Sequence, residues 1–196
     1  MLTVSPDPVV VESQLQTGEL ACQECSGVLA PWGYARTRTV GRGLGRVRLR
    51  PRRGRCLGCG RTHVLLPATM LLRRGDLVEV VGGALAAGAV GDGARTIAQA
   101  LGVPRSTVRG WLARFADQAE RVRAHFTGWA VWLGVAPADL SPQVSPVADA
   151  VAAMVAASVA ACGEFAGLGR WAFVSAATGG RLLANTSAPF PAPWRG

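Results

Sequence analysis

Cys22-Gln23-Glu24-Cys25 and Cys56-Leu57-Gly58-Cys59 are the two segments that decide the fold of the first third of this chain. Each Cys-x-x-Cys turn can present two sulfur atoms to one metal ion, so the two turns supply the four ligands of a tetrahedral site. Because four thiolates close the coordination shell, we expect a structural metal ion and no metal catalysis. These four cysteines are therefore the predicted metal ligands.

Other interpretations of the cysteines are open. Disulfides suit a secreted protein, but the chain has 5 cysteines and no signal segment before Cys22. A four-thiolate iron site uses similar spacing, although an electron carrier has no need for a dense arginine field. We therefore expect one structural Zn²⁺. His63 could replace a cysteine as ligand, but a partly exposed strand histidine is the simpler interpretation.

Positive charge is concentrated between and just after the cysteine pairs. All 21 basic residues of the 196-residue chain are arginines, and against 12 acids they give a formal charge of +9. No acidic residue lies between Glu24 and Asp76, a segment rich in arginine. This charge favours a polyanionic partner, double-stranded DNA in the first place, with RNA open as well. The arginines expected to contact phosphates are Arg46, Arg48, Arg50, Arg52 and Arg53. Alternatively, the arginines only offset the charge of a four-thiolate zinc centre.

The segment from Arg46 to Arg50 alternates arginine with Val47 and Leu49. This period of two predicts a strand with its arginines on one face and its apolar side chains on the other. Short hairpins around one metal ion form a zinc ribbon, which we place at residues 20–70. Such a module is too small to fold on its own core, so metal binding, at about 10–16 kcal/mol, would provide most of its folding energy.

A second strong signal is the run ARTIAQALGVPRSTVRGWL at residues 94–112. It predicts a helix-turn-helix in which Gly102 makes the sharp turn and small Ala98 allows the helices to approach closely. The expected buried positions are Ile97, Leu101, Val103, Val108 and Trp111. Residues 77–89 predict a preceding helix, and the apolar stripe continues as Phe115, Ala119, Val122 and Phe126.

The exposed front of the second helix would then carry Arg105, Ser106, Arg109 and Gly110. Arg105 and Arg109 are the expected base readers, because an arginine fork matches the O6 and N7 atoms of guanine. Ser106 and Thr107 lie near the helix start, where short hydroxyls hold phosphates, and Arg95 could contact the DNA backbone from the first helix.

The order of these motifs resembles the N-terminal part of bacterial insertion-sequence transposases. The resemblance rests on the ribbon, on the segment RCLGCGRTHVLLP at residues 55–67 and on the helix-turn-helix, and it covers residues 20–127. It is closest to an actinobacterial family of stand-alone zinc-ribbon and helix-turn-helix proteins associated with mobile elements. Two positions depart from the pattern. Ser26 stands where glycine often follows the first turn, and Pro104 stands where a serine or threonine usually caps the recognition helix.

The expected fold is mainly α with a small β zinc ribbon, in four regions. Residues 1–19 form an extended leader that could add an edge strand through Val9–Val11, and residues 20–70 form the zinc ribbon. Residues 75–127 form the helix-turn-helix DNA-binding domain. Residues 128–196 form a C-terminal region of apolar helices, at 147–161 and 165–177, with an extended tail. Because these helices carry little charge, they either pack on the helix-turn-helix or form a homodimer.

Several function classes are disfavoured. The acids after the helix-turn-helix lie in no pattern of a two-metal nuclease, so we expect no catalytic residues and no enzyme. The longest apolar run, 150–163, is shorter than the roughly 20 residues that cross a bilayer, so the expected location is cytoplasmic and nucleoid-associated.

The sequence thus predicts a zinc-containing, sequence-specific DNA-binding protein, either a transcription regulator or a transposon accessory factor with a transposase or integrase as partner. The alternatives are a protein-assembly adaptor that recruits a recombinase or polymerase, and an inactive transposase fragment.

Overall fold

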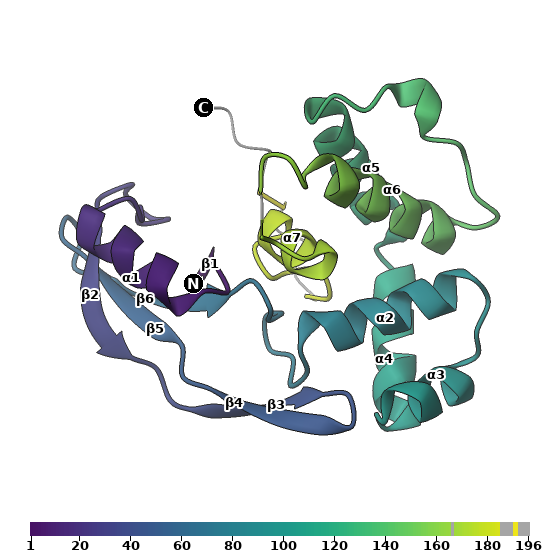
Figure 1. The fold of residues 1–196 in the computed structure, drawn as a ribbon, viewed down its shortest axis with the longest axis horizontal. Coiled ribbons are helices and arrows are strands. Elements are labelled where there is room, and N and C mark those ends of the chain that lie inside the picture. Colours follow the sequence, from purple (N-terminus) through teal and green to yellow (C-terminus); the bar gives the residue numbers. More distant parts are fainter. Residues whose placement is uncertain (166, 185–189, 192–196) are drawn as a thin grey trace.

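The computed structural model describes residues 1–165, 167–184 and 190–191, which form an N-terminal β region beside a helical region (Figure 1). The elements of the β region are β1 (Leu2–Val4), α1 (Pro8–Thr17), β2 (Leu29–Tyr34), β3 (Arg38–Arg42), β4 (Gly45–Leu49), β5 (Arg52–Cys56) and β6 (Thr62–Pro67). Those of the helical region are α2 (Val78–Ala89), α3 (Ala94–Leu101), α4 (Arg105–Ala116), α5 (Ala119–Trp132), the 3-10 helix η1 (Pro137–Asp139), α6 (Pro146–Ala160) and α7 (Arg170–Ala177). The predicted fold class is confirmed.

Two sheets make up the β region. Four strands form one sheet in the order β1-β6-β5-β2, in which β1 runs parallel to β6 and the other neighbours are antiparallel. Strands β3 and β4 form a separate two-stranded sheet, a long hairpin that extends toward the helical region (Figure 1). Leu29 at the start of β2 pairs with Cys56 at the end of β5, which brings the two cysteine turns to the same end of the sheet.

Neighbouring leucines on β6 serve two different cores, because successive strand residues face opposite sides of a sheet. Leu65 packs beneath α1 with Val11, Leu15 and Leu29, in a cluster that also contains Cys22 and Cys56. Leu66 packs instead with Val40 and Met70, and the inward residues of the hairpin, Val47 and Leu49, cover this second cluster. The hairpin is therefore fixed to the sheet by its apolar face.

The expected extended leader at residues 1–19 is wrong in its main part. Residues 2–4 do form an edge strand, but Val9–Val11 belong to helix α1. Asp7 caps that helix by accepting a hydrogen bond from the Val9 N–H at 2.8 Å, and Pro8 occupies its first turn. Gly18 ends it in the left-handed conformation. Val11 and Leu15, one turn apart, are the buried residues.

The helix-turn-helix has the predicted core. Ile97, Ala98, Val103, Val108 and Trp111 are buried, and Leu101 packs partly buried against them. The stripe from Phe115 to Phe126 continues this core into α5. Gly102 takes the turn with φ 64°, as expected.

The C-terminal helices pack on the helix-turn-helix, one of the two arrangements expected for them. Helix α6 lies along α5, and α7 packs on α2 and reaches β1. Ser175 on α7 donates a buried hydrogen bond of 2.6 Å to the Met70 carbonyl, and the Leu72 N–H donates to the Gly180 carbonyl at 2.8 Å. These contacts join the β region to the helical region.

The described residues also bear on membrane-spanning helices and on the expected C-terminal tail. Among the described residues, no helix combines the length and apolar character that a membrane crossing requires. The expected extended tail at residues 189–194 lies outside the described residues, apart from Phe190 and Pro191.

Alanine substitutions at two adjacent glycines of α2, Gly82 and Gly83, test this packing, because they should change the free energy of unfolding in opposite directions. A Cβ atom at Gly82 would lie 2.0 Å from Trp171 Cδ2, whereas one at Gly83 would meet only Leu101 Cδ2, at 3.8 Å. We expect Gly82→Ala to lower the free energy of unfolding by about 1–3 kcal/mol through overpacking. Gly83→Ala should raise it by about 0.5–1 kcal/mol through helix propensity. Chemical denaturation measures both, and equal effects would contradict the packing of α7 on α2.

Candidate metal centre and nucleic-acid interface

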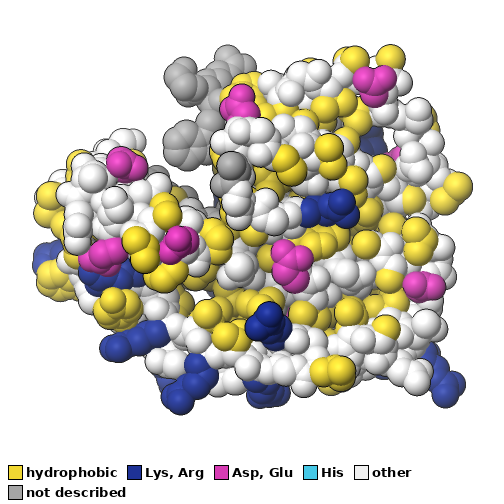
Figure 2. Space-filling model, in the orientation of Figure 1, with side chains coloured by type: hydrophobic (Ala, Val, Ile, Leu, Met, Phe, Trp, Pro, Cys, Tyr) yellow, Lys and Arg dark blue, Asp and Glu magenta, His cyan; other side chains and the backbone are white. Residues whose placement is uncertain are grey.

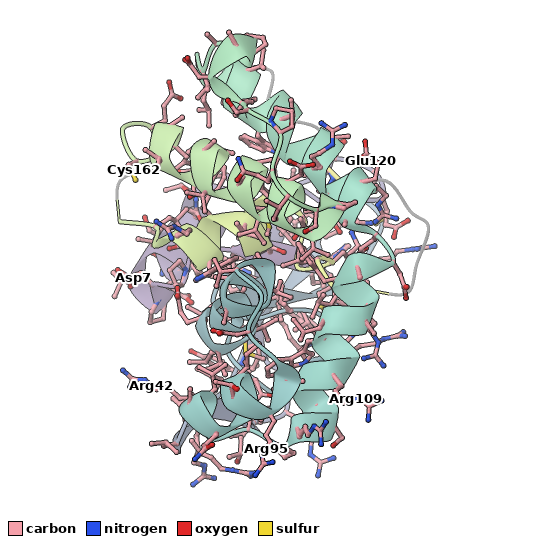
Figure 3. The ribbon with its side chains drawn as sticks, turned by 90° about the vertical axis from the view of Figure 1, so that its right-hand side faces the viewer. Asp7, Arg42, Arg95, Arg109, Glu120 and Cys162 are labelled. Carbon is pink, nitrogen blue, oxygen red and sulfur yellow. The ribbon has the colours of Figure 1, made fainter. Side chains whose placement is uncertain are left out.

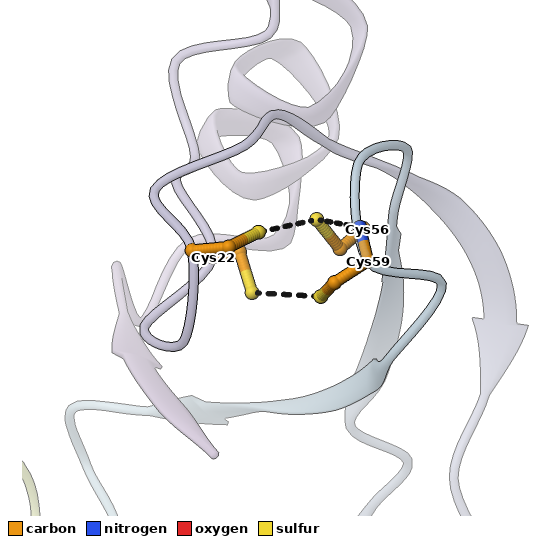
Figure 4. A group of neighbouring side chains, drawn as sticks. Cys22, Cys56 and Cys59 are labelled. Atoms are coloured by element: carbon orange, nitrogen blue, oxygen red, sulfur yellow. Dashed lines mark hydrogen bonds between the residues drawn. The ribbon is translucent and has the colours of Figure 1, made fainter.

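Four cysteine sulfurs converge between the turn before β2 and the turn after β5 (Figure 4). The Sγ atoms of Cys22, Cys25, Cys56 and Cys59 all lie within 4.8 Å of one another. Cys22 and Cys59 are 3.8 Å apart, and Cys25 and Cys56 are 3.4 Å apart. Cys22 and Cys56 are buried, while Cys25 and Cys59 are exposed at the mouth of the cluster.

These separations fit a tetrahedral metal site. A metal–sulfur bond of about 2.3 Å implies sulfur atoms about 3.8 Å apart at the corners of the tetrahedron. The four predicted ligands therefore form a group that can hold one metal ion, and their chemistry suits a thiophilic metal. A fully coordinated ion of this kind holds protein segments together and leaves no position for a substrate.

The backbone of each turn polarises one of its sulfurs. The Cys59 N–H, 3.4 Å from Cys56 Sγ, lowers the pKa of Cys56 to about 6, and the Glu24 N–H lowers that of Cys22. Cys59 behaves differently. An N–H from Arg61 lowers its pKa, but the thiols of Cys25, Cys56 and Cys22, together with burial, outweigh this and raise it to about 11. Adjacent thiolates repel, so a cation is needed to ionise all four.

His63 lies closer to the cluster than expected. It is on β6, as predicted, but it is buried, with 5% of its surface exposed, and its Nε2 atom is 3.2 Å from Cys22 Sγ. The expectation of a partly exposed histidine is wrong. In this position the ring can hydrogen-bond to a ligand sulfur, the kind of contact that orients and tunes metal ligands.

Ser26 occupies the same position in the first cysteine turn as Gly60 does in the second. Each residue follows the last cysteine of its turn, and each has a positive φ, 58° for Ser26 and 72° for Gly60. The left-handed conformation costs a non-glycine residue about 1–2 kcal/mol. The departure at Ser26 therefore leaves the shape of the turn unchanged, at a cost in backbone strain.

Helix α4, the second helix of the helix-turn-helix, presents the expected polar residues to solvent. Arg105, Ser106 and Arg109 are exposed, as is Arg95 on α3, and Thr107 is half-buried. Gly110 is half-buried because the Arg114 side chain crosses it and donates a 2.8 Å hydrogen bond to its carbonyl. Pro104 precedes the helix without a side-chain cap, so its first N–H groups remain available.

The arginines of the β3–β4 hairpin lie along the same edge of the molecule. Figure 3 shows Arg42 of the hairpin, Arg95 of α3 and Arg109 of α4 at the same end of the structure, with Arg42 and Arg109 on opposite sides of that end. Figure 2 shows basic side chains gathered along this edge, below the hairpin and the helix-turn-helix, with most of the visible acidic side chains elsewhere. The exposed hairpin arginines are Arg38, Arg42, Arg46, Arg48 and Arg50. The salt bridges found in the described part of the chain involve none of them.

Two of the predicted phosphate contacts, Arg52 and Arg53, form hydrogen bonds within the fold. Arg52 forms a 2.8 Å ion pair with Glu12 of α1 and donates to the Gly33 carbonyl. This pairing lowers the pKa of the Glu12 carboxyl, first of all through the hydrogen bond. Arg53 donates to the Thr62 hydroxyl at 3.0 Å. Both arginines are half-buried, so they are less open to a partner than the hairpin arginines.

The comparison with protein families agrees with the helical geometry. A family model described as a homeodomain-like domain matches residues 82–123, from the middle of α2 into α5. No curated protein and no solved structure matches the chain. A homeodomain-like helix-turn-helix suggests DNA binding, and α4 is the third helix of the matched three-helix unit.

Glycines at the metal centre provide a matched pair of substitutions. A Cβ atom at Gly27 would lie 3.1 Å from Cys56 Sγ and 3.4 Å from Cys25 Sγ, whereas one at Gly58 would make ordinary contacts at 3.6 and 3.8 Å. Because a bound metal prevents the sulfurs from moving, we expect Gly27→Ala to weaken metal binding about tenfold or more. Gly58→Ala should change it little. Competition with a zinc chelator measures both affinities, and equal values would contradict the cluster geometry.

Proposed function

We propose that this chain is a zinc-containing protein that binds double-stranded DNA in a sequence-specific manner. The observation that carries the proposal is the shared arginine edge, to which the recognition helix and the β3–β4 hairpin both contribute. Phosphate contacts from such an edge provide affinity, and contacts to base edges provide specificity.

In this proposal, α4 lies in the major groove with Arg105 and Arg109 as the base-reading residues. Both are exposed on the first half of the helix, one turn apart, so they lie on one face. Each arginine can form a bidentate contact with guanine O6 and N7, which contributes about 1–3 kcal/mol of discrimination. Ser106, Thr107 and Arg95 are assigned to phosphates beside this contact.

The metal has a structural role in this proposal. Cys22, Cys25, Cys56 and Cys59 would hold one Zn²⁺, which supplies four bonds that close the two turns against each other. Zinc is preferred over iron because a chain so rich in exposed arginine suits a DNA-binding protein better than an electron carrier. Arg55 and Arg61 stay close to the second turn, where Arg61 pairs with Glu24 at 3.1 Å and Arg55 donates to the Gly60 carbonyl.

The hairpin arginines are assigned to DNA phosphates rather than to charge compensation at the metal. They belong to a hairpin outside the four-stranded sheet that holds the cysteine turns. The biological process is proposed to be transcription regulation or an accessory role in the movement of a mobile element, both of which need such a reader.

Selection of random DNA duplexes at physiological salt tests this function. We expect the full chain to enrich a defined motif, and Arg105→Ala and Arg109→Ala each to lose discrimination at one base pair by about 1–3 kcal/mol. Arg170→Ala, which removes an exposed arginine at the start of α7, is the matched control and should leave the motif unchanged. If the full chain enriches no motif, the proposed function is wrong.

A further inference from the structure

The tip of the β3–β4 hairpin is packed against the turn of the helix-turn-helix. A Cβ atom at Gly102 would lie 2.3 Å from Leu44 Cδ2, and one at Gly43 would lie 3.4 Å from the Leu101 carbonyl oxygen. Just behind the tip, the Gly41 N–H donates to the Gly75 carbonyl at 2.8 Å, and the Leu77 N–H donates to the Gly41 carbonyl at 2.9 Å. The tip is thus held in a fixed position beside the start of α4.

The tip is also unusually slim. Between Arg42 and Arg46 the sequence is Gly43-Leu44-Gly45, so only one side chain projects from the turn, and 89% of it is exposed. Gly43 needs its glycine because its φ is 66°. Gly45 does not, because its φ is not positive and a Cβ atom there would meet no atom within 4 Å. Neither the backbone conformation nor the packing of the protein explains a glycine at Gly45.

The shape of the hairpin tip fits the minor groove of duplex DNA. An element placed beyond the end of a helix in the major groove crosses one phosphate strand and reaches the adjacent minor groove. That groove is about 6 Å wide, too narrow for a helix. Where A·T pairs narrow it further, its negative potential attracts inserted arginine side chains. A slim turn fits the narrow width of the groove, and an arginine on each side of the turn suits its negative potential.

We propose that the hairpin tip, residues 42–46, enters the minor groove next to the major groove that α4 occupies. Arg42 and Arg46 then reach past the phosphates to the floor of the groove and favour A·T pairs, while Leu44 packs against the sugar walls. The other hairpin arginines keep the phosphate contacts. This inference rests on the proposed function, because it needs α4 to be docked on duplex DNA. It adds a second reading element and a preference for A·T pairs on one flank of the core site.

Base analogues distinguish minor-groove reading from other contacts. The motif selected by the full chain is synthesised with each flank carrying A·T, G·C or inosine·C pairs. Inosine·C presents the minor groove of an A·T pair and the major groove of a G·C pair, since it lacks the guanine 2-amino group. We expect binding to weaken about 30-fold or more when G·C pairs occupy one flank and to recover with inosine·C, as expected for two readable positions.

Protein variants tie this effect to the tip. Gly45→Thr adds a branched side chain at an open strand position, so the thermal stability of the protein should not fall, but the flank preference should disappear. Gly75→Thr adds the same side chain at another open glycine, outside the tip, and should keep the preference. The double variant Arg42→Ala, Arg46→Ala should lose it.

The outcomes separate the two proposals. A chain that selects a core motif but binds all three flanks equally, or that treats inosine·C like G·C, contradicts the minor-groove inference alone. A preference that survives in a stably folded Gly45→Thr variant also contradicts it. A chain that selects no core motif contradicts the proposed function itself.

Discussion

The convergence of four cysteine sulfurs is the constraint on which the arrangement of the β region depends. The sulfurs fix the turn before β2 to the turn after β5, and Cys22 and Cys56 complete the small core beneath α1. That core is small for a stable domain, so the bonds of a metal would contribute much of its folding energy. The sheet in turn supports the hairpin through Leu66, and the hairpin reaches the helix-turn-helix at Gly102. A metal ion bound by these cysteines would thereby influence where charge is presented beside α4.

The features that the sequence predicts correctly are those with a local geometric requirement. Two Cys-x-x-Cys turns need only a shared metal, and the period of two from Arg46 to Arg50 places Val47 and Leu49 inward, as the structure has them. The sequence predicts the helix-turn-helix equally well, because Gly102 and the buried residues around it satisfy several requirements of one motif within a short segment. Which residues touch DNA is a different question, and those assignments remain predictions.

The features that the sequence does not predict depend on tertiary contacts or on local signals that have two interpretations. Asp7-Pro8 and Gly18 are a helix start and stop, but prolines are also typical of extended segments. The burial of His63 against Cys22 depends on the register of β6 with β5. Arg52 looked like another surface arginine, and only the unpredicted helix α1 supplies its partner, Glu12. The contact between the hairpin and Gly102 joins segments that no local pattern relates.

The most direct test measures the affinity of the protein for a set of duplexes that vary the core and the flanks, before and after a chelator removes the metal. The order of the affinities is then compared between the two states. If the metal holds the ribbon and α4 reads the bases, the metal-free protein should bind every duplex about 10- to 100-fold more weakly, because several phosphate contacts are lost. Its ranking of core variants should remain, and its ranking of flanks should disappear. An unchanged affinity, or a changed core ranking, would contradict the account.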